Sequence, residues 1–238
     1  MLQQTQVKTV IPYLLRFLDR YPTGEALARA PGGEVLKTCE NLGYYARARN
    51  IHRAAGVIME RHGGRIPGTR EELLRLPGIG PYTAGAILSI AFGRDVAAVD
   101  GNVRRVASRL FGITEPIDDA ATGKRIEAQV QALVPKHDPG RFNQALMELG
   151  AVCCKPRFPS CPSCPLRDGC RARAGNFARN LPVRRSKKTI PHREVVAAII
   201  RDGDGRALIV QRPSRGLLGA LWKFPGGILA PREARKEG

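Results

Sequence analysis

The sequence of 238 residues has no apolar run long enough to cross a membrane, and its first residues lack the charged-then-apolar pattern of a secretory signal. These absences argue against a membrane span and a secretory leader, so we expect an intracellular protein, a setting that disfavours disulfides. The four histidines fall in no metal-ligand spacing and are expected at the surface; they are His52, His62, His137 and His192.

Acidic residues are scarce. There are 21 Asp and Glu against 39 Lys and Arg, which gives a net charge of +18 and a pI near 10.5. An enzyme acting on small neutral metabolites has no need of this excess, so the composition favours a polyanionic partner. The alternative is a set of solvated basic faces without a specific ligand.

The first two thirds of the chain have a helical pattern. Residues 1–111 are predicted to form successive amphipathic helices, and Thr69 and Glu72 have the spacing of a capping box before an apolar run. Two more helices are predicted over 112–153, separated by the breaker PKHDPG.

The last third of the chain loses the helical pattern. Residues 173–193 are basic and contain no acid, which is typical of a linker. Beyond them, EVVAAIIRD and RALIVQRP flank a GDG turn, and LWKFPGGIL follows as a candidate third strand. This pattern predicts β structure over 194–238.

Five of the six cysteines cluster near the end of the helical region, and without disulfides such a cluster indicates a metal. Zinc ribbons usually show two short pairs with a long spacer, whereas this compact run fits one iron–sulfur cubane wrapped by a loop. Cys153 is expected to pack beside the ligands, and Cys39 to be a buried thiol. The candidate ligands, in the spacing C-x6-C-x2-C-x5-C, are Cys154, Cys161, Cys164 and Cys170.

A glycine turn, LPGIG, stands between two predicted helices. Gly78 and Gly80 permit a tight turn and a close approach to a ligand, and the start of the next helix offers unpaired N–H groups that can bind a phosphate. An ordinary corner between helices is the alternative. The segment LPGIGPYTAGAI resembles the helix-hairpin-helix motif of DNA-repair glycosylases, which implies contacts of Leu76, Gly78 and Gly80 with the DNA backbone.

The next stretch, DVAAVDGNVRRVASRLF, resembles the catalytic segment of the same glycosylases, in which an aspartate follows the hairpin. The resemblance implies that Asp100 is the catalytic carboxylate. The chemistry agrees, because cleavage of an N-glycosidic bond builds positive charge on the sugar, and a fixed carboxylate stabilises that charge and orients water. Taken alone, VDGN is a plausible turn or helix cap.

The endonuclease III branch of these enzymes places a Schiff-base lysine just after the last glycine of the hairpin, in a pattern like GVGRKTA. Here the letters are GIGPYTA, so Tyr82 occupies that position. A phenol cannot form an imine. The resemblance therefore implies hydrolysis by water, which leaves an abasic site.

LQQTQV, LGYYARARN, GPYTAGAI and VDGNVRRV occur in the order found in the adenine DNA glycosylase (MutY) family, which removes adenine mispaired with 8-oxoguanine or guanine. The resemblance implies a monomer that acts on double-stranded DNA in the cytoplasm, at the nucleoid. The implied site residues are Leu2, Gln4 and Thr5 in the minor groove, Tyr44 between bases, Gln144 facing the flipped adenine, and Tyr82 and Asn102 beside Asp100. Each also has a structural alternative, such as core packing for Leu2 or a solvent-facing position for Gln144.

The implied fold is mainly α. It comprises a helix-hairpin-helix six-helix domain over 1–111, an iron–sulfur domain over 112–172 that lacks its N-terminal helix and holds a 4Fe-4S cluster, and the linker over 173–193. A partial Nudix-like domain that recognises 8-oxoguanine follows over 194–238. GGILAPREARKEG lacks the carboxylate helix of a Nudix hydrolase, so no pyrophosphatase activity is expected.

Family members carry a glutamate two residues before the methionine that corresponds to Met1, in a pattern like SEVMLQQTQV, and this glutamate protonates the departing adenine. The resemblance implies that the sequence begins and ends inside the family's domains. We therefore expect slow catalysis, since a lost general acid costs about 10²–10⁴-fold. The rival interpretations are a pyrimidine glycosylase and lyase of the endonuclease III type, and a non-catalytic DNA-binding module.

Overall fold

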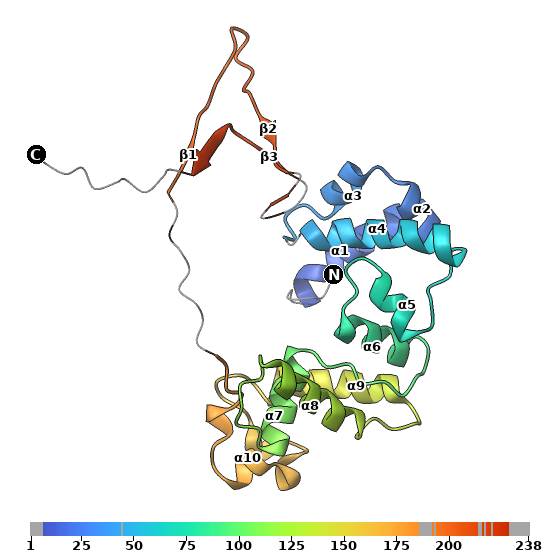
Figure 1. The fold of residues 1–238 in the computed structure, drawn as a ribbon, viewed down its shortest axis with the longest axis vertical. Coiled ribbons are helices and arrows are strands. Elements are labelled where there is room, and N and C mark those ends of the chain that lie inside the picture. Colours follow the sequence, from blue (N-terminus) through green and yellow to red (C-terminus); the bar gives the residue numbers. More distant parts are fainter. Residues whose placement is uncertain are drawn as a thin grey trace, which may run out of the picture. The chain divides into compact units, whose positions relative to one another are not determined.

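The computed structural model describes residues 7–43, 45–185, 192, 194–213, 216, 218, 219 and 221–228. The chain divides between Arg185 and Ser186 into two compact units, which we call the helical unit and the C-terminal unit (Figure 1). In the described part of the chain, no helix is both long enough and apolar enough to cross a membrane.

The helical unit begins with four amphipathic helices: α1 (Val7–Arg20), α2 (Gly24–Arg29), α3 (Gly32–Thr38) and α4 (Tyr45–His62). Helices α2 and α3 both contact α4. The four helices share one buried cluster of Phe17, Tyr21, Leu27, Val35, Cys39, Ala48 and Ala55. Cys39 is buried as predicted, and burial raises the pKa of its thiol, so the side chain stays neutral and packs as a small apolar group.

Helices α5 (Arg70–Arg75) and α6 (Pro81–Ile90) flank the glycine turn. Thr69 caps α5 as predicted: its Oγ1 accepts a hydrogen bond from Glu72 N at 3.4 Å and lies 2.6 Å from the Glu72 carboxylate, to which it donates. Gly78 has a φ of +80°, and a Cβ added there would lie 2.7 Å from Asn50 Cβ. The turn therefore requires glycine both for its backbone conformation and for its packing against α4.

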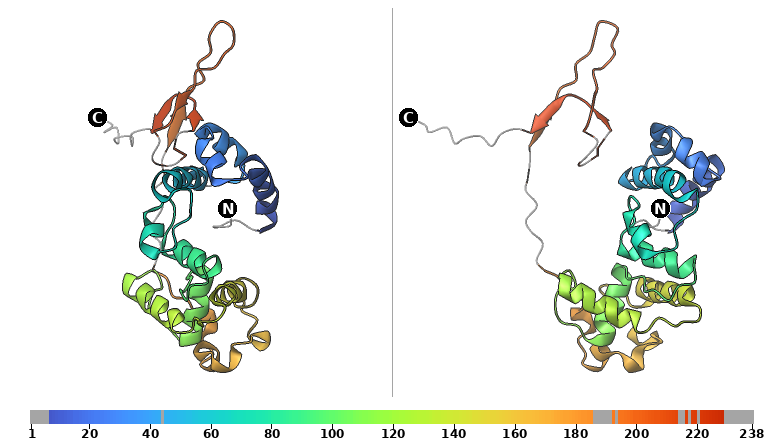
Figure 2. Two further views of the ribbon diagram at one scale, coloured as in Figure 1. Left: turned by 90° about the vertical axis from the view of Figure 1, so that its right-hand side faces the viewer. Right: turned by 45° about the vertical axis from the view of Figure 1, so that its right-hand side comes forward.

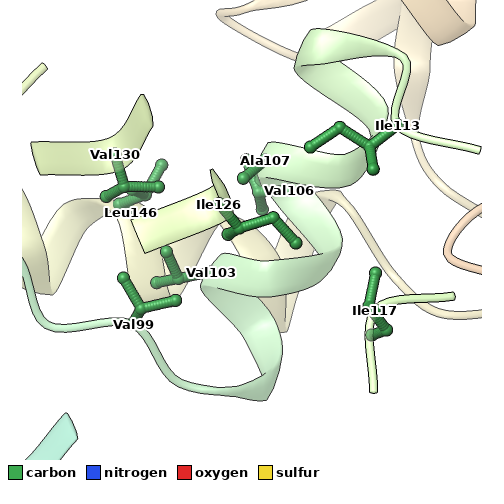
Figure 3. Close-up of a cluster of buried hydrophobic side chains, with 9 residues drawn as sticks. All are labelled: Val99, Val103, Val106, Ala107, Ile113, Ile117, Ile126, Val130 and Leu146. Carbon is green, nitrogen blue, oxygen red and sulfur yellow. The ribbon is translucent and has the colours of Figure 1, made fainter. Parts of the chain in front are cut away.

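A second apolar core surrounds α7 (Gly101–Phe111), which packs with α8 (Ala120–Gln131) and α9 (Pro139–Glu148). Figure 3 shows its buried side chains converging from these helices and the adjoining loops; they are Val99, Val103, Val106, Ala107, Ile113, Ile117, Ile126, Val130 and Leu146. The core runs across the boundary predicted between residues 111 and 112. Both sides of that boundary therefore belong to one compact unit.

After α9 the chain is held in short turns. They are the π-helix η1 (Leu149–Cys153), the 3-10 turns η2 (Cys161–Ser163) and η3 (Arg167–Gly169), the helix α10 (Arg171–Ala174) and the 3-10 turn η4 (Ala178–Asn180).

Residues 173–185 are part of the helical unit, so the predicted linker does not include them. Leu181 is buried, Ile117 N donates to the Val183 carbonyl at 3.0 Å, and Arg185 N donates to the Asp118 carboxylate at 3.1 Å. A buried apolar side chain and satisfied backbone groups fix this basic segment, and composition alone did not reveal either.

The C-terminal unit contains short antiparallel strands, as predicted. β1 (Val195–Ala197) pairs with β4 (Gly226–Ile228), and β2 (Val210–Gln211) pairs with β3 (Trp222–Lys223). At the GDG turn, the Asp202 carboxylate accepts from Arg206 N at 2.9 Å. Figure 2 shows this stretch as the orange loop that extends from the paired strands.

The second core supplies a test of the fold. Ile126 is fully buried among the side chains of α7, whereas Leu133 just beyond α8 is 45% exposed. Ile126→Ala should lower the free energy of unfolding by about 2–5 kcal/mol, because it removes buried apolar contacts and leaves a cavity. Leu133→Ala should change it by only about 0.5 kcal/mol. Urea denaturation followed by circular dichroism measures both, and equal effects would contradict the packing described.

Candidate active site

Asp100 caps the N-terminus of α7, directly after the buried residues Ala98 and Val99. Its Oδ1 accepts a hydrogen bond from Val103 N at 2.7 Å, and its Oδ2 accepts one from Asn102 Nδ2 at 3.1 Å. The two bonds fix the plane of the carboxylate at the start of the helix. Each oxygen keeps lone pairs for a further partner. The predicted catalytic residue is thus both a helix cap and a partly exposed anion.

Tyr82 lies in the first turn of α6 and is half-buried. Its hydroxyl donates to the Met147 sulfur of α9 at 3.4 Å. Burial, and then the negative charge of Asp100, raise the pKa of the phenol, so it stays protonated at neutral pH. The structure therefore brings Tyr82, Asp100 and Asn102 into one neighbourhood, in which Asn102 bonds to Asp100 and the charge of Asp100 acts on the phenol of α6.

Arg105 connects this neighbourhood to the cysteine segment. Its Nη2 donates to Asn102 Oδ1 at 2.9 Å and to the Gly150 carbonyl at 2.7 Å, while its Nε donates to the Cys154 carbonyl at 2.8 Å. Burial lowers the pKa of the guanidinium, while Cys154 and Asp100 act in the opposite direction. The side chain still carries its charge, because an arginine remains protonated in proteins. Asn102 is therefore held from both ends.

Arg109 lies one turn further along α7 and is 2% exposed. It donates to four carbonyl oxygens, those of Leu181, Cys154, Lys155 and Pro156, at 2.7–3.3 Å. It also lies 3.2 Å from the Cys154 sulfur. One buried cation thus anchors the start of the cysteine segment to the folded stretch around Leu181.

Sequence reasoning missed both arginines. The signal was present, because Arg105 and Arg109 are spaced four residues apart on the same side of a helix whose neighbours Val106 and Ala107 are apolar. A charged residue on a core-facing position indicates a buried polar network. Only the structure shows which acceptors satisfy it.

Five cysteines line one cavity beside Arg109: Cys153, Cys154, Cys161, Cys164 and Cys170. The four predicted ligands are therefore brought together from segments up to sixteen positions apart. Within the described residues, no group of three or more His, Cys, Asp or Glu side chains is arranged to hold a metal ion. Cys153, which was expected to pack aside, lies in the cavity as well.

Gln144 lies elsewhere on α9. It is exposed, its amide donates to the Gly140 carbonyl at 3.2 Å, and it borders a hollow of about 420 Å³ between the end of α6 and the start of α9. The hollow has a polar rim that includes Lys136, His137, Asp138 and Arg141. Gln144 and Tyr82 thus lie along the same pair of helices, and Gln144 does not touch Asp100 through any described hydrogen bond.

The predicted DNA contacts divide into two sets. Leu76 is 2% exposed and its side chain belongs to the core between α5 and α6, so it packs inside the protein. Gly78 is exposed, and Gly80 is the N-cap of α6. The remaining four, Leu2, Gln4, Thr5 and Tyr44, lie outside the described residues.

Comparison with known proteins places this geometry in a family. Residues 1–136 match the HhH-GPD superfamily of base excision DNA repair proteins, and the chain belongs to that superfamily. Two solved structures share the fold. A thermostable thymine-DNA glycosylase is 31% identical, with a TM-score of 0.67, and the match covers 73% of this chain and 80% of that chain. A non-covalent endonuclease III–DNA complex is also 31% identical, with a TM-score of 0.63 and the same coverage. The predicted helix-hairpin-helix glycosylase fold is confirmed.

The curated relatives of this chain indicate which branch of the superfamily it resembles. The human adenine DNA glycosylase is 37% identical, with coverage of 98% of this chain and 51% of the relative. The adenine DNA glycosylase of Buchnera aphidicola subsp. Baizongia pistaciae is 35% identical, with coverage of 94% and 64%. These relatives confirm the predicted resemblance to the adenine DNA glycosylase (MutY) family. The chain spans about half to two thirds of their length.

Gly150 supplies a test of the site. A Cβ added there would lie 2.6 Å from Asn102 Cβ, a contact closer than packed atoms allow. Gly150→Ala should therefore push η1 away from α7 and cost about 1–3 kcal/mol of unfolding free energy. Gly169→Ala is the matched control, because nothing lies within 4 Å of its added Cβ. Urea denaturation of both variants measures the difference, and a Gly150→Ala variant as stable as the control would contradict the contact.

Proposed function

We propose that this chain hydrolyses the N-glycosidic bond of adenine in double-stranded DNA, with adenine opposite 8-oxoguanine or guanine as substrate, and leaves an abasic site without cutting the strand. The observation that carries the proposal is the fixed Asp100 carboxylate at the N-terminus of α7, with Asn102 bonded to it and the Tyr82 phenol beside it. The similarity to adenine DNA glycosylases supports the choice of base.

The carboxylate suits the chemistry. Loss of adenine leaves positive charge on the sugar ring, and an anion held in place stabilises that charge without reorganising. Two hydrogen bonds hold Asp100, so its remaining lone pairs can face the sugar or orient a water molecule. The water adds its oxygen to the anomeric carbon and loses a proton, while the departing adenine gains one. Asp100 is a catalytic residue in this proposal, and Asn102 and Arg105 position it.

Tyr82 determines the absence of strand cleavage. A lyase needs an amine that attacks the same sugar carbon and forms an imine. The group beside Asp100 on α6 is a protonated phenol with a raised pKa. Water is then the nucleophile. The phenol can donate a hydrogen bond to the nucleotide once its hydrogen bond to the Met147 sulfur is broken.

Gln144 is proposed to face the extruded base. The bond to be cut is inaccessible inside the base stack, so the nucleotide must leave the duplex. A glutamine amide matches the donor and acceptor on the N6 and N7 edge of adenine. The Gln144 amide would exchange its local bond to Gly140 for this pair.

The net positive charge and the glycine turn at Gly78 both support DNA binding. The net charge of +18 favours a polyanion. The exposed turn at Gly78 leads into α6, whose first N–H groups have no partner within the helix and suit a phosphate oxygen. Endonuclease III has been solved as a complex with DNA, and it shares this fold. These contacts fix position on the duplex and read no sequence.

A 4Fe-4S cluster held by Cys154, Cys161, Cys164 and Cys170 is part of the proposal. The four thiols line one cavity. Arg109 is a buried cation whose described acceptors are carbonyl oxygens and one cysteine sulfur, and a buried charge needs a counter-charge. Four thiolates would supply it. The cluster would fix a segment that carries the exposed side chains of Lys155, Arg157 and Arg167, which can face phosphates.

The C-terminal unit is proposed to belong to a Nudix-like domain that reads 8-oxoguanine. Its described residues contribute short antiparallel strands with exposed apolar side chains, among them Val195 at 70% and Trp222 at 61% exposure. The polar GDG turn and the paired strands fit the start of a mixed domain. The proposal does not include a pyrophosphatase activity.

Removal of the carboxylate tests the mechanism. Asp100→Asn should lower the single-turnover rate of adenine release from an A:8-oxoguanine duplex by at least about 100-fold, because the amide cannot offset the charge on the sugar. The matched control is Asp19→Asn, since Asp19 is an exposed aspartate at the end of α1. Equal rates for Asp100→Asn and wild type would overturn the assignment.

Borohydride reduction separates hydrolase from lyase. Wild type and Tyr82→Phe should give no covalent adduct with the duplex, because trapping requires an imine from an amine nucleophile. A stable adduct formed by wild type would favour the endonuclease III-type reaction. Duplex binding that weakens with salt but shows no base release would favour a DNA-binding module.

A further inference from the structure

Cys153 is a fifth cysteine in the cavity that the four proposed cluster ligands line. It is the last residue of the π-helix η1, and Cys154 follows it directly. Single π-helical turns are rare in proteins, and those that occur are often found at functional sites. Here the turn brings two consecutive thiols to the wall of the same cavity.

Cys153 and Cys154 have different partners. The Cys154 sulfur lies 3.2 Å from Arg109 Nη1, on the side of α7. The Cys153 sulfur lies 3.5 Å from the Ser160 carbonyl. The two thiols therefore line the same cavity with different hydrogen-bond partners.

The backbone of Cys153 is fixed independently of any metal. Its carbonyl accepts hydrogen bonds from Lys155 N and Ser160 N, both at 2.9 Å, and Arg105 and Arg109 bind the next carbonyl, that of Cys154. These bonds do not involve the Cys154 side chain. Loss of that side chain would therefore leave the position of Cys153 largely unchanged.

We propose that Cys153 is a reserve ligand of the iron–sulfur cluster, which takes the place of Cys154 when the Cys154 sulfur is unavailable. The inference rests on the cluster assigned under the proposed function. In the exchange, one iron–sulfur bond to Cys154 is lost and one to Cys153 forms. The Cys153 thiol releases its proton as it binds, the released Cys154 thiolate takes up a proton, and no electron is transferred. The chemical class of the ligand is an iron–sulfide cubane.

The test measures iron and acid-labile sulfide per chain, with the visible absorption spectrum, in five purified proteins. They are wild type, Cys153→Ala, Cys154→Ala, the double variant Cys153→Ala/Cys154→Ala, and Cys170→Ala, which is a matched control because Cys170 has no neighbouring cysteine in the sequence. Wild type, Cys153→Ala and Cys154→Ala should keep their iron. The double variant and Cys170→Ala should hold about tenfold less, since even the loss of a partner of a ligand costs about that much in metal affinity.

The outcomes distinguish a failure of the proposed cluster from a failure of the reserve-ligand role of Cys153. Wild type without iron and sulfide would overturn the cluster and the reserve ligand together. A loaded wild type with Cys154→Ala as poor in iron as the double variant would overturn the reserve ligand alone. Cys154→Ser serves as a second variant, because its hydroxyl can still accept from Arg109, and it should also keep its iron. Circular dichroism at helical wavelengths monitors folding. If both Cys154 variants fail to fold, or fold without iron, the reserve-ligand role of Cys153 is overturned.

Discussion

The burial of two guanidinium groups on α7 is the constraint on which the helical unit depends. Arg105 and Arg109 are buried on the helix that carries much of the apolar core, and a buried charge is tolerated only when its hydrogen bonds are satisfied. The carbonyl oxygens that satisfy them come from the segment between Gly150 and Pro156 and from Leu181. Those distant backbone stretches are thereby fixed against one helix, and with them the cysteines.

Helix α7 consequently joins the two chemical features of the molecule. Its N-terminus carries Asp100, and its second and third turns carry the arginines that hold the cysteine segment. Asn102 is the link, because its amide donates to Asp100 while its oxygen accepts from Arg105. The carboxylate orientation and the backbone around Cys154 thus belong to one hydrogen-bond network, although 54 positions of the sequence separate Asp100 from Cys154.

Much of the site was readable in the sequence because it is local. The cap at Thr69 and the glycine turn at Gly78 depend on residues within a few positions of one another, and so does the GDG turn, where the Asp202 carboxylate accepts from Arg206 N. Asp100 and Tyr82 stood out through their family motifs, and the structure puts them together. The linker from residue 173 was less predictable, because composition shows charge but does not show that Leu181 finds a pocket.

By itself, the sequence determined the helical class, the cysteine spacing, the basic charge and the identity of the group beside Asp100, since these follow from periodicity, from residue type and from short-range spacing. Only the tertiary structure decided that Arg105 and Arg109 are buried, that Gly150 must lack a side chain against Asn102, and that Cys153 enters the cavity. The first two features depend on contacts between residues more than forty positions apart, and the third depends on how the cysteine segment folds back on itself. No local pattern encodes which partner a buried donor will find, because packing settles that choice.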